Sequence, residues 1–263
     1  SLQKFAAWAQ GVVWRGVDYT LPVTEVLAGY IRRYGAPDRR IHVIPNGINP
    51  VRFADGLAGE DIKAKYGLQG KLVLGFTGFI RGWNALDKVI DFITRDNGQH
   101  NLHLLVVGDG PARKELTQLA LTQGVSDRLT ITGVVGRDDV AGYIRAFDIA
   151  LIPGVTEYAS PLKLFEYLAL GRAIIAPDMP NIREILTDGE NAVLFPVQGE
   201  QEDAFSRAIL RLCSDAAMRK QIANGAKATI EAQGLTWSRN ALRVVEIVEK
   251  HLQDRTQSKT TAV

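Results

Sequence analysis

Short apolar segments alternate with amphipathic ones between residues 71 and 195. Continuous apolar runs are typical of strands buried on both faces of a sheet, and apolar positions at helical spacing mark the segments between them. This alternation predicts an α/β fold with a Rossmann-like, doubly wound parallel sheet. The predicted strands are 71–76, 102–107, 129–132, 149–152, 173–176 and 192–195, and the predicted helices between them are 86–94, 111–123, 138–146 and 161–170.

The segments on either side of this alternation have a different pattern. Two short strands are expected before it, with a helix that starts at an N-cap, Thr24, and ends at Gly35. Residues 48–70 are rich in glycine and charge, which indicates a connection between domains. Expected in these flanks are strands at 17–23 and 40–44, helices at 2–16, near 60–66, and at 200–212, 215–232 and 237–252, and a polar tail.

The segment from Thr156 to Ile185 holds the most informative helix. Ser160 occupies the position of an N-cap hydroxyl and Pro161 that of the first helical residue. Lys163 and Glu166 project together from a face away from the apolar stripe. They could form an exposed ion pair, or they could bind a ligand that carries both phosphates and hydroxyls beside the helix N-terminus.

Three loops at the ends of predicted strands could also approach a ligand. Gly78 lies in a loop where the backbone can come close to a ligand, and Arg81 could meet a phosphate or simply be solvated. The Gly108 segment resembles a dinucleotide fingerprint but lacks the third glycine, so a structural turn is expected there. Small residues at 133–136 make either a plain turn or room for a flat ring.

Composition narrows the possible functions. The chain has 263 residues, 46% of them hydrophobic and 23% charged, which is typical of a globular protein. A net charge of +2 without a dense basic run argues against nucleic acid as a partner. The single Cys213 is compatible with a reducing compartment, and four scattered histidines give no metal-ligand spacing, so no metal site is expected.

No apolar run approaches the length of a transmembrane helix, and no secretion signal is visible. The expected location is the cytoplasm, with peripheral contact to the inner face of the membrane as an open alternative. Because the chain begins with Ser1, we expect it to be a piece of a longer protein.

Taken in order, these segments resemble the GT-B glycosyltransferases, specifically the large retaining group 1 that includes glycogen-synthase-like and bacterial polysaccharide enzymes. The resemblance covers roughly residues 17–250. It is carried by Ile41-His42-Val43-Ile44-Pro45-Asn46-Gly47-Ile48, Gly75-Phe76-Thr77-Gly78-Phe79 with Trp83, Leu104 to Pro111, Thr132-Gly133-Val134-Val135 and Pro161 to Gly171.

The resemblance implies a division of the chain. Residues 1–46 would be the C-terminal remnant of the N-terminal, acceptor-binding domain, and 47–235 would form the domain that binds the nucleotide-sugar donor. Residues 236–263 would be a crossover helix and polar tail. The acceptor, a glycan or a lipid-linked molecule, would be bound through the N-terminal domain.

The resemblance also implies a role for each site residue. Glu166 would bind the ribose hydroxyls, and Arg81, Lys163 and the amides around Ser160 to Leu162 would stabilise the diphosphate without a metal or other cofactor. The expected catalytic residues are Arg81, Lys163 and Glu157. The expected nucleotide-sugar contacts are Gly78, Phe79, Gly133, Val134, Tyr158, Ala159, Ser160, Pro161, Leu162 and Glu166.

The chain departs from the family at two positions. Relatives often have a second glutamate eight positions before the one at Glu166, where this chain has Tyr158, with Glu157 one place away. Relatives also often carry a lysine or histidine near Asn84, so the diphosphate clamp here would be thinner.

The function expected from these residues is the donor-binding part of a retaining hexosyltransferase, inactive or weakly active as this chain alone. The alternative is a non-catalytic nucleotide-binding or assembly module with the same fold. A dinucleotide oxidoreductase is disfavoured by the broken fingerprint at Gly108.

Overall fold

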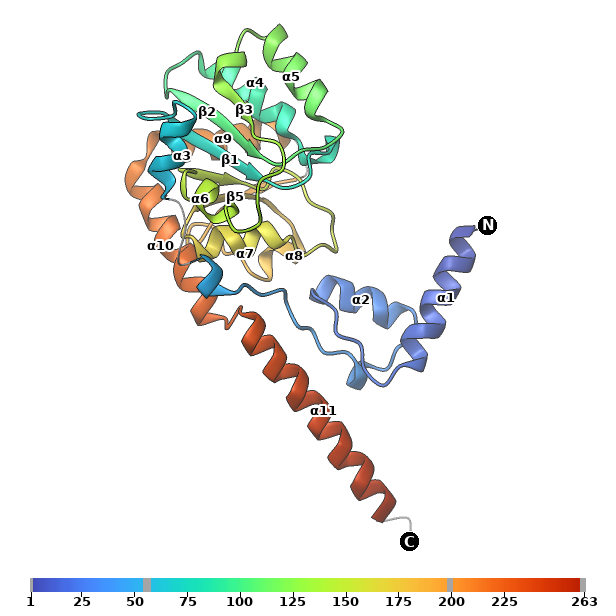
Figure 1. Cartoon of the computed structure of the whole chain (residues 1–263). Helices are drawn as coiled ribbons and strands as arrows, with labels where there is room; N and C mark the ends of the chain where they lie inside the picture. Colours follow the sequence, from blue (N-terminus) through green and yellow to red (C-terminus); the bar gives the residue numbers. More distant parts are fainter. Residues whose placement is uncertain (1, 54–57, 198–200, 261–263) are drawn as a thin grey trace.

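A computed structural model describes residues 2–53, 58–197 and 201–260. Its centre is a six-stranded sheet in the order β3-β2-β1-β4-β5-β6, with every neighbouring pair parallel (Figure 1). This is the doubly wound architecture that the alternation predicts. The strands are β1 Leu72–Thr77, β2 Leu102–Val107, β3 Leu129–Ile131, β4 Ile149–Leu151, β5 Ala173–Asp178 and β6 Val193–Pro196.

Helices cover both faces of the sheet, and each face has its own hydrophobic cluster. One face is packed by α4 Leu86–Asp96, α5 Arg113–Thr122 and α9 Gln201–Ser214. The other is packed by α3 Gly59–Lys65, α6 Val140–Arg145, α7 Leu162–Ala169 and α10 Ala216–Ala232. The strands are therefore enclosed between two helical layers.

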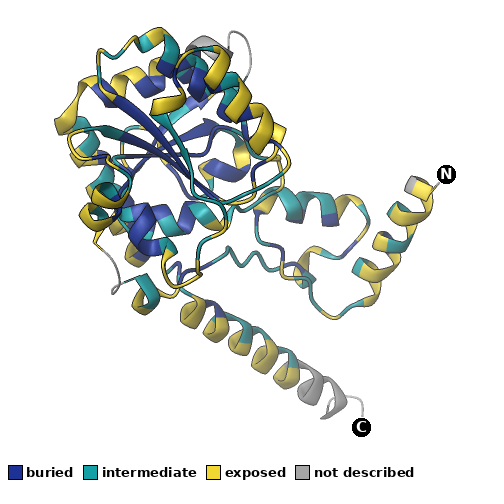
Figure 2. Cartoon of the chain, turned by 45° about the horizontal axis from the view of Figure 1, so that its top comes forward, coloured by how far each residue is buried: buried dark blue, intermediate teal, exposed yellow. Residues whose placement is uncertain are grey.

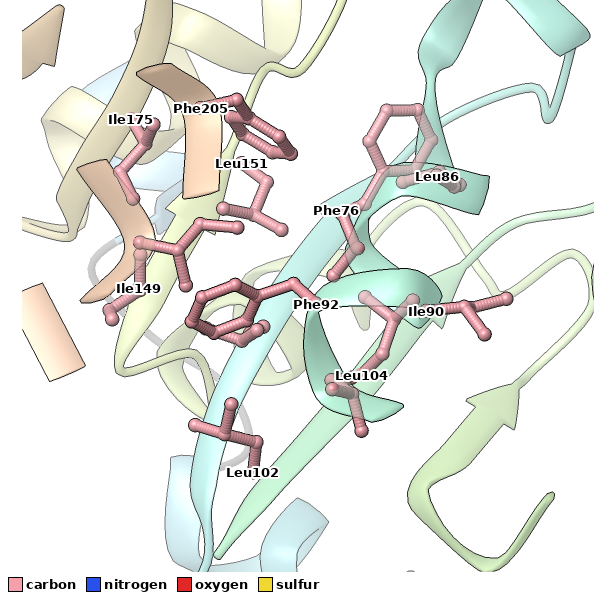
Figure 3. Packing of buried hydrophobic residues seen from close by; sticks show 14 of the residues in the cluster. Phe76, Leu86, Ile90, Phe92, Leu102, Leu104, Ile149, Leu151, Ile175 and Phe205 are labelled. Atoms are coloured by element: carbon pink, nitrogen blue, oxygen red, sulfur yellow. The ribbon is translucent and has the colours of Figure 1, made fainter. Parts of the chain in front are cut away.

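Neighbouring residues of β1 show why the strands are apolar without a break. Leu74 and Phe76 pack in the first cluster, which Figure 3 shows, whereas Val73 packs in the second. All three side chains are at most 1% exposed. Each such buried side chain stabilises the fold by about 1.5–3 kcal/mol relative to an exposed one, so both faces demand apolar residues.

The strand order places a crevice at the carboxyl ends of the two central strands, β1 and β4. From β1 the chain moves outward to β2, while the later half of the chain moves outward from β4 in the opposite direction. In sheets of this kind the carboxyl ends of the two central strands flank the site where ligands bind. The residues that follow Thr77 and Leu151 therefore border the candidate site.

The segment before the sheet contains α1 Leu2–Gly16 and α2 Glu25–Arg33, and Thr24 caps α2 as predicted by accepting a bond from the amide of Leu27. The two strands expected at 17–23 and 40–44 are wrong. Only Thr20 and Ile41 form an isolated bridge. Because Pro22 has no N–H to donate, the pairing does not extend into a ladder.

The last helix, α11 Trp237–Thr260, projects away from the sheet and is largely exposed on one side (Figures 1 and 2). It continues past the predicted end at residue 252, so most of the expected tail is helical, and residues 261–263 lie outside the described residues. Thr236, the residue before α11, forms a bridge with Ile48, which lies where the chain enters the α/β body. A short helix that the pattern does not predict, α8 Pro180–Arg183, follows β5.

Candidate functional site

Helix α7 begins one residue later than its local sequence suggests. Pro161, and not Ser160, is the N-cap residue, with φ −69° and ψ 122° and no side-chain cap. The carbonyl of Ser160 instead accepts a hydrogen bond of 2.8 Å from the side chain of Asn46. The long-range bond holds this stretch extended, so the predicted capping by Ser160 is wrong, while the predicted glycine stop is present at Gly171 with φ 57°.

A cleft of ≈ 500 Å³ opens beside the start of α7 at the carboxyl edge of the sheet. Seven of the thirteen predicted site residues line it, namely Gly78, Phe79, Val134, Pro161, Leu162, Lys163 and Glu166, whereas the predicted Gly133 does not. The lining consists of Thr77, Gly78, Phe79, Val107, Gly108, Asp109, Val134, Val135, Val140, Pro161, Leu162, Lys163 and Glu166.

Lys163 lies half-buried in this cleft, with its ammonium group 3.6 Å from the centre of the Phe76 ring. Burial lowers its pKa to about 7 from an ordinary 10.5, and attraction to Glu166 offsets part of that shift. The side chain forms no hydrogen bond or ion pair with any described residue. A desolvated cation without a hydrogen-bonding or ion-pair partner is suited to receive an anion.

Glu166, one turn along α7, is also half-buried and has no hydrogen-bonding or ion-pair partner among the described residues. Burial raises the pKa of its carboxyl group, and the positive charges of Lys163, Arg137 and Arg52 oppose that change. The exposed Lys163–Glu166 ion pair considered from the sequence is therefore absent. The two groups face the cleft as a separate cation and acceptor.

Glycines let three loops meet under the cleft. Gly108 has φ 146°, and a Cβ there would lie 2.0 Å from the carbonyl oxygen of Gly78. Gly108 also bridges to Gly133. A Cβ on Gly78 would in turn lie 3.2 Å from the ammonium of Lys163. The Gly108 segment thus packs loops together, as expected for a structural turn, and leaves the loop at Gly78 open to the cleft.

The 156–160 loop contributes none of the residues that line this cleft, so Glu157, Tyr158, Ala159 and Ser160 stand beside it. Tyr158 is 54% exposed, and the hydroxyl of Tyr30 lies 3.5 Å from Glu157. The loop is held by side chains from distant segments. Its carbonyls accept bonds from Thr24, Asn46 and Asn181.

Arg81 does not line the cleft. Its guanidinium lies 4.8 Å from the ring centres of both Phe79 and Trp83, which are 59% and 60% exposed. This stacking holds the cation at the rim, next to Phe79, which does line the cleft. Contact between Arg81 and a phosphate stays a prediction.

A second cavity of ≈ 310 Å³ continues on the other side of Glu166 and is one that sequence reasoning missed. Arg52 and Arg137 line it, and Arg52 is bound to Asp138 at 2.7 Å. No local signature marks these arginines, because Arg52 lies in the expected connection. Asn181, 3% exposed, was also missed, and its only signal is a polar residue just after a buried strand.

No group of three or more histidine, cysteine, aspartate or glutamate side chains in the described ranges is arranged to hold a metal ion. No helix in the same ranges has the length and apolar character needed to cross a membrane.

Comparison with known proteins places the fold. HepE from Anabaena, in a crystal structure with UDP, superposes with a TM-score of 0.82 at 17% identity, covering 95% of this chain and 70% of that one. Together with sucrose-phosphate synthase from Thermosynechococcus elongatus, at a TM-score of 0.80, this match confirms the α/β fold of the GT-B glycosyltransferases.

Sequence comparison gives a consistent result. An alpha-D-kanosaminyltransferase from Streptomyces kanamyceticus is 25% identical over 227 residues, which is 84% of this chain and 58% of the relative. A glycosyltransferase from Methanocaldococcus jannaschii is 26% identical over 219 residues, 81% of this chain and 55% of the relative. The chain thus spans little more than half the length of these relatives.

The fold and the cleft define an α/β protein of the glycosyltransferase type. The family model described as glycosyl transferases group 1 matches residues 71–215. The chain therefore belongs to the group 1 glycosyltransferases.

Proposed function

We propose that the cleft beside α7 binds the nucleoside diphosphate sugar of a hexosyltransferase. The observation that carries the proposal is the pair of charges on one helix, Lys163 and Glu166, half-buried in the same cleft without a hydrogen-bonding or ion-pair partner among the described residues. A nucleoside diphosphate can bind both side chains. Its anionic phosphates complement Lys163, and the two neighbouring hydroxyl donors of its ribose complement Glu166. UDP is the first nucleotide to test, since HepE was crystallised with it.

Glu166 is proposed to accept hydrogen bonds from the two ribose hydroxyls. Bonds to an ionised acceptor are shorter and stronger than neutral ones, and they also need the carboxylate to stay charged. The positive potential of Lys163, Arg137 and Arg52 favours that ionised form against burial. The base would lie against Gly133 and Val134, where Val134 is 86% exposed and offers an apolar surface.

The diphosphate is proposed to lie between Gly78 and the first turn of α7. Lys163 would supply a positive charge there, and the unpaired amides at the helix N-terminus, around Pro161 and Leu162, would add hydrogen-bond donors. As the glycosidic bond breaks, negative charge grows on the leaving nucleoside diphosphate. These groups, with Arg81 at the rim, would stabilise that charge.

The sugar would extend from the diphosphate toward the 156–160 loop, where Glu157, Tyr158 and Ala159 lie. Transfer is proposed to proceed with retention to a glycan or lipid-linked acceptor that is bound by residues of the N-terminal domain. Residues 1–46 are proposed to supply only part of such a domain, so this chain alone is expected to bind the donor and transfer poorly. The cytoplasm, at or near the inner face of the membrane, remains the proposed location.

Thermal shift with UDP, GDP, ADP and NAD tests the proposal. At least one nucleoside diphosphate should raise the melting temperature of the chain, and Glu166→Ala should lose most of that rise. The matched control is Glu190→Ala, which removes an exposed glutamate outside the cleft lining. Failure of every nucleoside diphosphate to stabilise the wild-type chain would contradict the donor-site assignment, and so would a full shift in Glu166→Ala.

One observation favours a second candidate, a non-catalytic module that keeps the nucleotide site. Tyr158 stands eight positions before Glu166, where many relatives have a glutamate, and Asn84 stands near the position of their lysine or histidine. Asn84 is 6% exposed and accepts a bond from the backbone amide of Arg81, so it stabilises the loop. Nucleotide binding without any transfer by the longer protein would favour this candidate.

A further inference from the structure

Asn181 in α8 is a buried polar side chain that touches the 156–160 loop at two points. It is 3% exposed, and its amide nitrogen donates to two loop carbonyls, those of Thr156 at 3.1 Å and Ala159 at 2.7 Å. Its own carbonyl oxygen, Oδ1, is buried and has no hydrogen-bond partner. The two acceptors fix the orientation of the amide, because only the NH₂ group can face two carbonyls.

An unpaired buried oxygen makes this residue a costly choice for stability. A residue chosen only for packing would leave no such group. The hydrogen bonds that Asn181 does make fix the direction of two peptide groups in the 156–160 loop. The side chains of Glu157 and Tyr158 in that loop are exposed.

The geometry of the peptide bond shows what that direction does. In a planar trans peptide the N–H points opposite to the C=O of the same unit. The carbonyls of Thr156 and Ala159 share their peptides with the amides of Glu157 and Ser160. By drawing both carbonyls inward, Asn181 turns both amides outward, away from the packed interior.

Neither of these two amides donates a hydrogen bond within the described part of the chain. They precede the N-terminus of α7, where Pro161 and Leu162 already line the cleft. Outward amides that continue a helix N-terminus form an extended set of donors for an anion.

We propose that Asn181 is a positioning residue that aims the amides of Glu157 and Ser160 at the terminal phosphate of the bound nucleotide. The inference rests on the proposed function, since it names a residue that shapes the same site without touching the ligand. Asn181 acts only through the loop, so it should influence the outer phosphate and not the nucleoside.

The loop provides a matched control. Asn46 donates an equally short bond of 2.8 Å to the carbonyl of Ser160, but the next residue is Pro161, whose nitrogen has no hydrogen. Removing the Asn46 side chain therefore loosens the same loop without releasing a free amide.

The test compares UMP with UDP by calorimetry in three forms of the chain: wild type, Asn181→Ala and Asn46→Ala. In the wild type the second phosphate should improve affinity about tenfold or more, as expected for charge-assisted bonds. Asn181→Ala should lose most of that gain while UMP affinity stays within about twofold, and Asn46→Ala should keep it. In amide-resolved NMR, UDP but not UMP should shift the Glu157 and Ser160 signals of the wild type.

Should Asn181→Ala fail to fold, Asn181→Leu takes its place, because leucine fills a similar volume and cannot donate to the carbonyls. An unchanged UDP-to-UMP ratio in the Asn181 variant would overturn the inference, and so would an equal loss in the Asn46 variant. If the wild type binds no nucleotide at all, the proposed function itself fails, which is distinguishable from these results. If UDP proves to be the wrong base, the mono- and diphosphate of the base that stabilises the chain most are used instead.

Discussion

Lys163 and Glu166 lie three residues apart on α7, as ion-paired residues often do, yet they form no salt bridge. The ammonium of Lys163 instead lies over the ring of Phe76 at 3.6 Å. Neither charge neutralises the other through a direct contact, and the consequences of that separation can be measured.

The lowered pKa of Lys163, about 7, predicts that nucleotide binding takes up a proton above neutral pH. At pH 8 most of the free chain has a neutral Lys163, and a bound phosphate would restore the charge. About one proton should be absorbed per nucleotide at pH 8, and affinity should fall as the pH rises above 7. Calorimetry in buffers of different ionisation enthalpy measures this uptake.

Lys163→Arg is the control for that measurement, because a guanidinium stays protonated throughout the range. The variant should bind without the uptake, apart from any proton bound by the phosphate itself. Equal uptake by the wild type and the variant would assign the proton to the ligand and contradict the prediction.

Gly108→Ala should strongly destabilise the fold. The new Cβ would lie 2.0 Å from the carbonyl oxygen of Gly78, at a backbone φ of 146° that alanine rarely adopts. We expect a loss of about 3 kcal/mol or more in the free energy of unfolding, measured by urea titration. Gly124→Ala is the matched control, since φ is 72° there and nothing lies within 4 Å, so only backbone strain of about 1 kcal/mol is expected.

Tyr167→Phe should destabilise the floor of the cleft. The hydroxyl of Tyr167, which is fully buried, accepts a bond of 2.9 Å from the backbone amide of Thr77 and lies 3.2 Å from its side-chain oxygen. Removing the hydroxyl leaves that amide unpaired away from water, at a cost of about 1–3 kcal/mol. Chemical denaturation measures the loss, and an unchanged midpoint would show that water replaces the hydroxyl.

Glu184→Ala should loosen α2 from the α/β body. The carboxylate of Glu184 accepts bonds from the backbone amides of Glu25 at 2.9 Å and Val26 at 3.2 Å, so it caps the helix from a distant segment. The loss should be about 1–2 kcal/mol of local stability. Amide exchange in α2 should accelerate while exchange in β1 stays unchanged. Glu190→Ala, which removes an exposed glutamate from the same connection between α8 and β6, should alter neither.

The sheet could be predicted because burial on both faces leaves its mark on every residue of a strand. Leu74, Phe76 and Val73 are apolar for this reason. A strand can be predicted from them without knowledge of any contact between distant segments. Thr24 could be recognised for a similar reason, since its capping bond reaches only three residues along the chain.

Local signals failed where a distant side chain decides the backbone. Ser160 followed by Pro161 has the composition of a helix start, yet Asn46 binds the Ser160 carbonyl across 114 residues of chain and the helix begins later. The contacts of Asn181 and Glu184 likewise join segments that periodicity treats as independent. The sequence pattern located Lys163 and Glu166, but not the residues that shape the loop beside them.

The bridge between Ile48 and Thr236 brings two distant parts of the chain together at the base of the α/β body. The chain enters the α/β body at one of these residues and leaves it at the other, and they are neighbours. Gly47 keeps the crossing tight, since a Cβ there would lie 2.7 Å from the backbone of Thr236. Residues 1–46 and α11 therefore leave the α/β body at one point, and the bonds from Thr24 and Asn46 tie the first of these segments back to the loop that borders the cleft.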